Sequence, residues 1–330
     1  MADCILIRLK NMSPLHIGTG KENYDFAAAS LQSDTLSAAL AAMKAQKGDK
    51  ENLEEFLASF TVSSAFPYIG NRYFMPKPMG RINVEITDGD EYIAKKKIKK
   101  LKFIEWGLWK ELIAGKKLCV KEKQLQGNFL LTNNNDGYHE YPYRLQVNQR
   151  VAVPLDEGKD SEPFFFEWTY FHEDAGLFCL LQAPVALQDE LIALFRQLGE
   201  SGIGTDKSVG GGRFEVEAED FLLPKVVGAD SALLLSLYLP TEEELSKLQL
   251  KDSCYELLLR NGYMAGSSET DFMHLRKKSV YMFNVGSMFK TVEPLHGKVV
   301  DLRPEWNDGR LHPAYRSGKP FTILIKQPGL

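Results

Sequence analysis

The alternation of hydrophobic and polar positions divides the chain into short strands and helices. Residues 3–10 read Asp-Cys-Ile-Leu-Ile-Arg-Leu-Lys, an apolar run that becomes alternating at its end and predicts a strand. Ser33 and Asp34 offer an N-cap to a helix that ends before Gly48. Its apolar positions at helical spacing are Leu36, Ala39, Leu40 and Met43. A second helix is expected over residues 49–59.

The next stretch combines rigid and strongly basic segments. Pro76 and Pro78 flank Lys77, which excludes a helix there and predicts an extended, rigid segment. Residues 95–102 carry six lysines and two apolar residues. This run has two interpretations of about equal weight, a track for phosphates or an edge strand whose lysines block unwanted pairing.

Residues 115–162 are weakly patterned and hold a strong turn signal at Asn133–Gly137. We expect a protruding loop or hairpin here. Regular strands resume at 163–171 and 177–182, followed by an amphipathic helix at 189–198 that buries Leu191, Leu194, Phe195 and Leu198. A glycine-rich segment and a strand at 213–217 come next.

The pattern restarts after Pro224. Strands are expected at 233–239, 254–260, 279–283 and 321–326, and Thr241 is placed to cap a helix. This order predicts an α+β protein of two domains, residues 1–225 with an insertion at about 105–162, and residues 226–330.

Composition narrows the class of protein. The chain is 44% hydrophobic and 25% charged, with no apolar run long enough for a membrane span and no secretory signal, so we expect a cytoplasmic protein. Its four cysteines include no C-x-x-C pair, which argues against a zinc or redox site and for reduced thiols. The net charge of −4 weakens any argument for nucleic-acid binding from bulk electrostatics.

The glycine-rich loop, residues 202–212, is the most informative feature. It holds five glycines together with Lys207 and Ser208, and Arg213 follows it. Glycines let the backbone approach a ligand closely, and successive amides can form an anion nest, so the loop is a candidate phosphate site built on Gly210, Gly211 and Gly212. It matches neither a nucleotide P-loop nor G-x-G-x-x-G. The alternative is a flexible connector.

Other candidates are His16, beside Gly18, and Lys77. The imidazole could stack on a base or bond a phosphate; it could also be a half-buried strand-end residue or, least favoured, a general acid or base in metal-free RNA cleavage. The sequence shows no paired catalytic carboxylates and no metal signature. We therefore expect neither a cofactor nor an enzyme.

Several segments together carry a resemblance to a known family. The strand followed by Pro14–Gly18, the helix opening at Ser33–Leu36 and the run Gly212–Phe214 resemble the RAMP superfamily of CRISPR proteins. Four further segments resemble the subunit of type III-A (Csm) complexes that caps the guide RNA at its 5′ handle. They are Ala65–Tyr68, Phe74–Pro78, Lys96–Phe103 and Val285–Phe289.

The resemblance implies a fold, a function and partners. The fold is two ferredoxin-like (RRM-like) modules with a glycine-rich loop and an inserted β-hairpin thumb. The function is non-catalytic binding of the crRNA 5′ handle in antiviral defence, and the partners are the large polymerase/cyclase-like subunit and the backbone RAMP subunits, with no membrane. The expected RNA-binding residues are His16, Gly18, Lys77, Lys207, Ser208, Gly210, Gly211, Gly212 and Arg213. The alternatives are a metal-free endoribonuclease that processes repeat RNA and a pure assembly protein.

Overall fold

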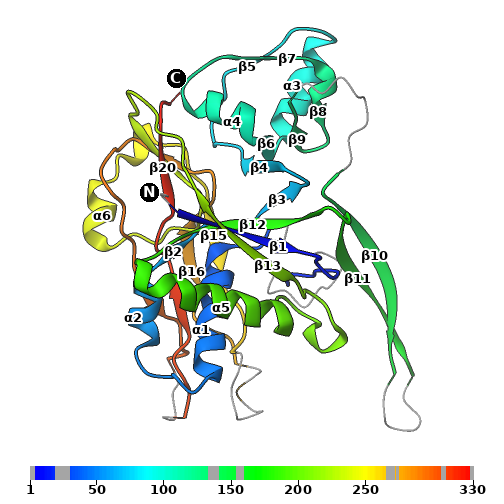
Figure 1. Ribbon diagram of the computed structural model, residues 1–330, viewed down its shortest axis with the longest axis vertical. Coiled ribbons are helices and arrows are strands. Elements are labelled where there is room, and N and C mark those ends of the chain that lie inside the picture. The colour runs from blue at the N-terminus through cyan, green and yellow to red at the C-terminus, as the bar shows by residue number, and fades with distance from the viewer. Residues whose placement is uncertain are drawn as a thin grey trace.

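The protein has a mixed α+β fold built around one long antiparallel-rich sheet (Figure 1). The computed structural model describes residues 4–18, 30–132, 141–153, 160–264, 272, 275–305 and 310–327. None of the helices within these ranges combines the length and apolar character needed to span a membrane.

The central sheet has the strand order β13-β1-β12-β3-β4-β6-β9-β8, with β2 paired to β12. Strand β1 lies inside it, antiparallel to β12 through Leu9↔Leu177 and to β13 through Ile7↔Ala218. The strands are β1 Cys4–Lys10, β2 Thr61–Val62, β3 Phe66–Ile69, β4 Arg72–Pro76, β6 Phe103–Glu105, β8 Leu125–Gln126, β9 Phe129–Leu130, β12 Ala175–Gln182 and β13 Glu215–Phe221.

The two faces of this sheet bury different cores because side chains alternate along each strand. Ile5, Ile7 and Leu9 point to helices α1 (Ser33–Gln46), α2 (Leu53–Ala58) and α5 (Val185–Ser201). Cys4 and Leu6 point to the opposite core, which contains α4 (Trp106–Ile113) and the fully buried Trp109. The sheet is therefore covered by helices on one side and by two smaller units on the other, although Val299 and Tyr315 of the second unit also pack on the helix side.

One of these units, residues 77–132, is called the upper subdomain below and lies at the top of Figure 1. Besides α4 it holds β5 (Val84–Ile86), α3 (Glu91–Lys100), β7 (Leu118–Val120) and the short 3-10 helix η1 (Glu122–Gln124). Strands β5 and β7 run parallel. Trp109 ties the subdomain to the sheet, since its indole N–H donates to the carbonyl of Pro76 at 2.9 Å.

The other unit is formed by the C-terminal third, whose strands fall in three small sheets: β17-β14-β20, β15-β16 and β18-β19. Their bounds are β14 Ser231–Leu234, β15 Leu257–Arg260, β16 Val280–Phe283, β17 Met288–Phe289, β18 Val299–Asp301, β19 Tyr315–Ser317 and β20 Thr322–Ile325. The helices are α6 Glu242–Lys247 and η3 Leu250–Asp252. Thr241 and Glu244 form the predicted capping box of α6.

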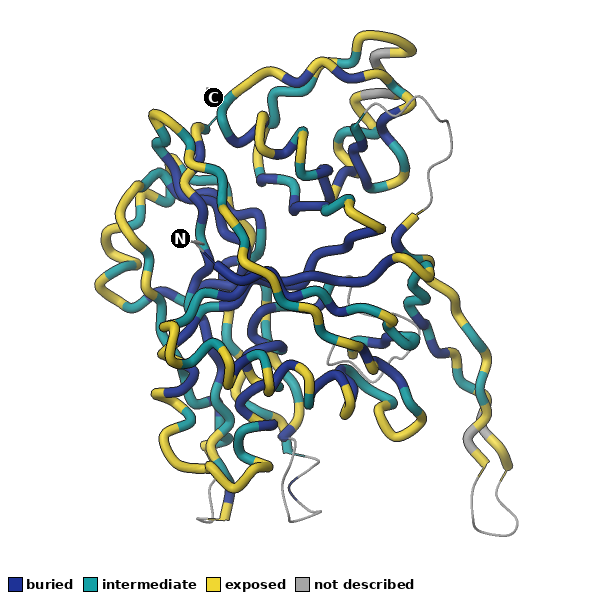
Figure 2. Tube along the Cα trace, viewed as in Figure 1, coloured by how far each residue is buried: buried dark blue, intermediate teal, exposed yellow. Residues whose placement is uncertain are grey.

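A two-stranded ribbon leaves the body of the protein on the right of Figure 1 and is largely exposed in Figure 2. Strands β10 (Tyr143–Ala152) and β11 (Glu162–Phe171) pair with each other along their whole length. At its base the ribbon is bonded to the segment after β1, because the amides of Leu15 and Thr169 donate to each other's carbonyls at 3.0 and 2.9 Å.

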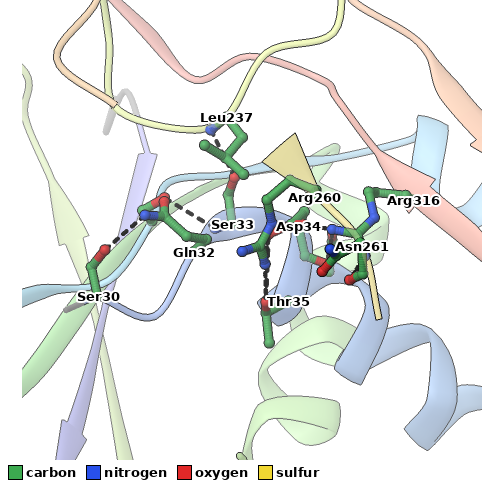
Figure 3. A network of polar contacts seen from close by, with 11 residues as sticks. Ser30, Gln32, Ser33, Asp34, Thr35, Leu237, Arg260, Asn261 and Arg316 are labelled. Carbon is green, nitrogen blue, oxygen red and sulfur yellow. Dashed lines mark hydrogen bonds and ion pairs between the residues drawn. The ribbon is translucent and has the colours of Figure 1, made fainter. Parts of the chain in front are cut away.

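A buried polar network joins α1 to the C-terminal third (Figure 3). The Asp34 carboxylate accepts hydrogen bonds from Arg260 at 2.8 and 3.0 Å and from Arg316. Asp34 is 2% exposed and Arg316 8%. The Ser33 hydroxyl accepts from the Leu237 amide at 2.9 Å. The first residues of α1 therefore form a contact between the helix side of the central sheet and the C-terminal third.

Most predicted elements are present, with three corrections. The lysine run does not form an edge strand. It lies in and just after α3, because the Asp90 carboxylate caps that helix by accepting from the Tyr92 and Ile93 amides at 2.8 and 3.0 Å. Ser33 and Asp34 do not cap α1, whose N-cap residue is Gln32, and the Gln32 side chain makes no capping hydrogen bond.

The third correction concerns the hairpin, which is present but continues to Phe171, while residues 105–132 fold into the upper subdomain instead. All four cysteines are free; Cys4 and Cys179 are buried and Cys119 is exposed. The turn predicted at 133–137 lies outside the described residues. The domain boundary at 225/226 stays a prediction.

Candidate nucleic-acid interface

The glycine-rich loop connects α5 to β13 through backbone conformations that favour glycine. Helix α5 ends at Ser201, and Gly202 follows with φ +80°. Gly204, Gly210 and Gly212 have φ of +92°, +87° and +68°. Asp206 adopts the same left-handed region with φ +57°, just before the 3-10 helix η2, Lys207–Val209.

The loop satisfies much of its own backbone. Gly210, Gly211 and Gly212 donate their amides to the carbonyls of Lys207, Asp206 and Pro14, at 3.0, 3.1 and 2.9 Å. These three amides are therefore not available as the anion nest that the sequence predicts. What they provide is rigidity, because each closes a turn within the loop or bonds the segment after β1.

Close packing explains several of the glycines. A Cβ on Gly212 would lie 1.8 Å from the Ile203 carbonyl oxygen, and one on Gly211 would lie 2.8 Å from Cη2 of Trp168. A Cβ on Gly210 would meet nothing within 4 Å, and one on Gly18 only a Thr205 methyl at 3.5 Å. Gly211 and Gly212 thus serve the fold, whereas Gly210 faces open space and Gly18 has room for a methyl group.

The ribbon holds the loop from one side through residues that the sequence analysis did not select. Arg150 of β10 forms an ion pair with Asp206, and its guanidinium carbon lies 4.5 and 5.3 Å from the ring centroids of Phe166 and Trp168. The available signal was an aromatic residue at every second position, Phe164, Phe166 and Trp168, although Phe165 interrupts the alternation. The pattern could not show that this face meets the loop.

His16 belongs to the same contact. Its Nδ1 lies 2.7 Å from the carbonyl oxygen of Glu167, and its ring centroid is 4.2 Å from that of Phe166. The carbonyl of His16 accepts from the Thr205 amide at 3.0 Å. At 1% exposure the imidazole meets protein rather than solvent, so it has no open face for RNA and instead supports the loop.

The remaining predicted residues separate into two places. Lys207, Ser208 and Arg213 are exposed on the outer rim of the loop, and Gly18 is exposed nearby across its contact with Thr205. Lys77 is elsewhere, at the end of β4, where its amide donates to the Lys102 carbonyl at 2.8 Å. Strands β12 and β3 lie between β1 and β4, and the single surface expected for Lys77 and the loop stays a prediction. Burial lowers the pKa of Lys77.

A cavity of about 370 Å³ lies between the base of the ribbon and the upper subdomain. Its walls are mostly apolar, with a few polar groups among them, which is the usual character of a pocket for a small ring system. Leu15, Ile17, Lys102, Asn128, Tyr143 and Thr169 are among its lining residues. The cavity therefore adjoins the same post-β1 segment that carries His16 and Gly18.

Comparison with known proteins points to one family. Residues 228–325 match the family model described as CRISPR Csm4 C-terminal domain. A Csm4 protein of Mycobacterium tuberculosis is 29% identical over 318 residues, which cover 93% of this chain and 94% of the relative. The chain is therefore similar to Csm4 proteins along nearly its whole length. A Csm4 protein of Thermococcus onnurineus is 26% identical, over 76% of this chain and 80% of its own length.

Solved structures agree on the fold. A chain of the Csm1–Csm4 cassette crystallised with cA4 has a TM-score of 0.62 and 20% identity, over 99% of both chains. A chain of the Csm3–Csm4 subcomplex of a type III-A interference complex has a TM-score of 0.63 and 16% identity, over 98% of this chain and all of the other. At such identities the likeness concerns the fold, and this chain therefore shares the mixed α+β fold of Csm4 structures.

Proposed function

We propose that this chain is a Csm4-family protein and a non-catalytic subunit of a type III-A CRISPR effector complex, and that the rim of its glycine-rich loop binds the 5′ handle of the crRNA. The observation that carries the proposal is the exposed rim itself. Lys207, Ser208 and Arg213 stand on a loop that is held in place by internal amide bonds, by Trp168 and by His16. A rigid basic loop binds phosphates at low entropic cost.

The surrounding fold supports this proposal. We assign β1, α1, β3, β12, α5 and β13 to one ferredoxin-like unit, because β13-β1-β12-β3 is the 4-1-3-2 order that a β-α-β-β-α-β chain gives. The glycine-rich loop then connects the second helix of the unit to its last strand. A second ferredoxin-like unit in the C-terminal third stays a prediction, since its strands are divided among small sheets.

The cavity gives the handle a second point of attachment. An RNA strand that follows the rim from Arg213 to Gly18 passes its mouth, where the lining Tyr143 could stack on a splayed base and Lys102 or Asn128 could bond its edge. Shape-selective binding of this kind suits a handle whose sequence is fixed.

The partners follow from the relatives. Csm4 proteins of the same fold were crystallised in a Csm1–Csm4 cassette and in a Csm3–Csm4 subcomplex. We propose the large cyclase-like subunit and a backbone RAMP subunit as the corresponding partners of this chain. Both are compatible with a chain of net charge −4, because neighbouring subunits can share the electrostatic attraction of RNA.

The nuclease alternative is weaker because of the placement of His16. A general acid or base must reach the proton that it transfers, whereas this imidazole is 1% exposed and bonded to a backbone carbonyl. In the part of the chain that is described, no three His, Cys, Asp or Glu side chains are grouped to hold a metal.

The deciding experiment measures the affinity of the full chain for handle RNA and for a scrambled RNA across salt concentrations. Lys207→Ala with Arg213→Ala should weaken binding about tenfold and lower the salt slope by about 1.4 units, at 0.7 per contact on a single strand. Gly18→Ala adds a methyl group that the fold accepts, and it should weaken handle binding if RNA approaches that backbone. The matched control is Lys225→Ala, an exposed lysine after β13.

Equal effects of the rim and control variants would contradict the proposal, as would handle RNA binding no better than scrambled RNA. Melting temperatures should be unchanged in all of these variants, since each altered side chain is exposed or, at Gly18, gains an ordinary contact.

A further inference from the structure

Positive charge is concentrated in one part of this acidic chain. The upper subdomain, residues 77–132, has thirteen Lys and Arg against seven Asp and Glu, a net of +6 in a chain whose total is −4. The rest of the molecule therefore carries −10. Such segregation creates a local positive field that the net charge conceals.

Helix α3 holds the densest part of this charge. Lys95, Lys96, Lys97, Lys99 and Lys100 fall in its last six residues, Lys102 follows, and no acidic residue occurs between positions 92 and 104. All of them except Lys97 are exposed. Lys97 forms an ion pair with Glu122 at 2.7 Å. The lysine face, defined here as Lys95, Lys96, Lys99 and Lys100, is thus turned to solvent.

Structural needs account for only part of this pattern. Lysines in the last turn of a helix interact favourably with its dipole, which suits Lys97, Lys99 and Lys100. The like-charged pairs Lys95–Lys99 and Lys96–Lys100 oppose helix formation by about 0.2–0.5 kcal/mol each. Protection of a sheet edge is not a reason either, because the run is helical. An acid-free lysine run that opposes its own helix points to a function for the charge.

An aromatic side chain stands within the same surface. Tyr92 is 67% exposed, and the Lys96 ammonium lies 4.3 Å from its ring centroid. Exposed lysines beside an exposed aromatic ring are the two parts of a sequence-tolerant single-strand site, which combines phosphate attraction with base stacking. The opposite side of α3 anchors it, since Ile98 packs on the core beneath.

The lysine face is separate from the glycine-rich loop. Figure 1 shows α3 at the outer end of the upper subdomain, across the central sheet from α1, α5 and the loop. Ile98 of α3 packs on the core that contains Cys4 and Leu6, whereas Ile203 of the loop packs on the core that contains Ile5 and Ile7. The two surfaces therefore lie on opposite sides of the sheet.

We propose that the lysine face and Tyr92 form a second nucleic-acid site, which takes the sugar-phosphate backbone of a single strand irrespective of its sequence. This site goes beyond handle binding and does not depend on it. A strand held here would be a segment of RNA or DNA outside the handle, brought to the complex by charge and retained by stacking on Tyr92.

The test uses the full chain and a fluorescein-labelled 20-nucleotide oligo-U. Lys95→Gln, Lys96→Gln, Lys99→Gln and Lys100→Gln are combined, because glutamine keeps the helix propensity of lysine. The salt slope should fall by up to about 3 units, at about 0.7 per phosphate contact, and affinity at low salt should fall at least about tenfold. Tyr92→Ala should weaken binding about fivefold or more while the salt slope stays unchanged.

Two further variants make the result specific. Replacing the same four lysines by arginine should preserve the affinity. Replacing Lys47, Lys50, Lys225 and Lys251 by glutamine removes the same charge from exposed positions elsewhere, and it should change the affinity less than threefold. Preference for handle over scrambled RNA should survive in the α3 variant, so failure of this site and failure of the handle proposal are distinguishable.

The proposal is overturned if the α3 glutamine variant binds oligo-U like the parent, or if the control variant weakens binding equally. It is also overturned if oligo-U binding is unchanged while the α3 variant no longer copurifies with a coexpressed large subunit. The lysines would then face an acidic protein surface.

Discussion

The buried contact between α1 and the C-terminal third yields a quantitative prediction. Asp34→Asn keeps the shape of the side chain but removes the charge that faces Arg260 and Arg316. Burial lowers the pKa of the Arg316 guanidinium, with Asp34 opposing that shift and Arg260 adding to it. Without Asp34, two cations would share a buried site with no counter-ion.

The size of the effect follows from that burial. Removing one partner of a buried ion pair lowers the free energy of unfolding by about 3–5 kcal/mol. Because the amide oxygen introduced by Asp34→Asn still accepts a hydrogen bond, we expect a loss of about 3 kcal/mol. Arg316→Met removes the stranded charge. The double variant should therefore be less destabilised than the two single variants together, with a coupling energy of about 2 kcal/mol.

Urea unfolding of the parent, both single variants and the double variant measures these energies. In the parent, the central sheet with its helices and the C-terminal third are expected to unfold in one transition. Asp34→Asn should give two transitions because it weakens the contact between α1 and the C-terminal third. Glu243→Gln is the control, since the ion pair of Glu243 with Lys247 is exposed at 78% and 72%, and no measurable change is expected. A loss below about 1 kcal/mol in Asp34→Asn, or additive single effects, would refute this account.

Three other predictions test the loop, the acid stability and the absence of catalysis. Gly211→Val should lower the melting temperature with or without RNA because its side chain meets Trp168; an unchanged melting temperature would show that the loop adapts freely. Burial opposes ionisation of Glu105, but hydrogen bonds from Arg72 and the Thr132 amide outweigh it and lower its pKa. Glu105 therefore stabilises the fold above its unfolded pKa of about 4.5, and that stability is lost as the pH falls through the lower folded value. Glu105→Gln should cost about 2 kcal/mol at neutral pH and flatten the decline in stability below pH 5; an unchanged acid slope would contradict this. Excess protein should not cleave labelled repeat RNA with or without magnesium, and His16→Ala should lower stability only; specific cleavage that His16→Ala abolishes would restore the nuclease alternative.

Local sequence patterns correctly predicted those helices and strands that depend on neighbouring residues alone. The apolar run of β1, the helical spacing after Ser33 and the inward face of α5 each reflect which side of one element is buried. The capping box of Thr241 and Glu244 is complete within four residues. The lysine run was interpreted as a phosphate track or an edge strand, and its helix was missed because that helix depends on a cap at Asp90 that the sequence analysis did not identify.

The site divides in the same way. The sequence located the glycine-rich loop and its exposed residues Lys207, Ser208 and Arg213, because glycines and charges mark a surface connection. It could not show that Trp168 leaves no room for a side chain at Gly211, or that His16 is buried against Phe166. Both facts arise when the ribbon, about 40 residues away in sequence from the loop and farther from His16, folds back onto them.

What only the tertiary structure decided is the partner of each buried charge. Asp34 appears in sequence as a helix cap, yet it binds Arg260 and Arg316, which lie 226 and 282 residues further along the chain. A buried carboxylate is costly unless cations or hydrogen-bond donors contact it. Which residues contact it depends on how the helices, the sheet and the C-terminal third pack together. The same holds for Lys77, whose flanking prolines set its local conformation while the order of the strands placed β4, at whose end it lies, beyond β12 and β3 from β1.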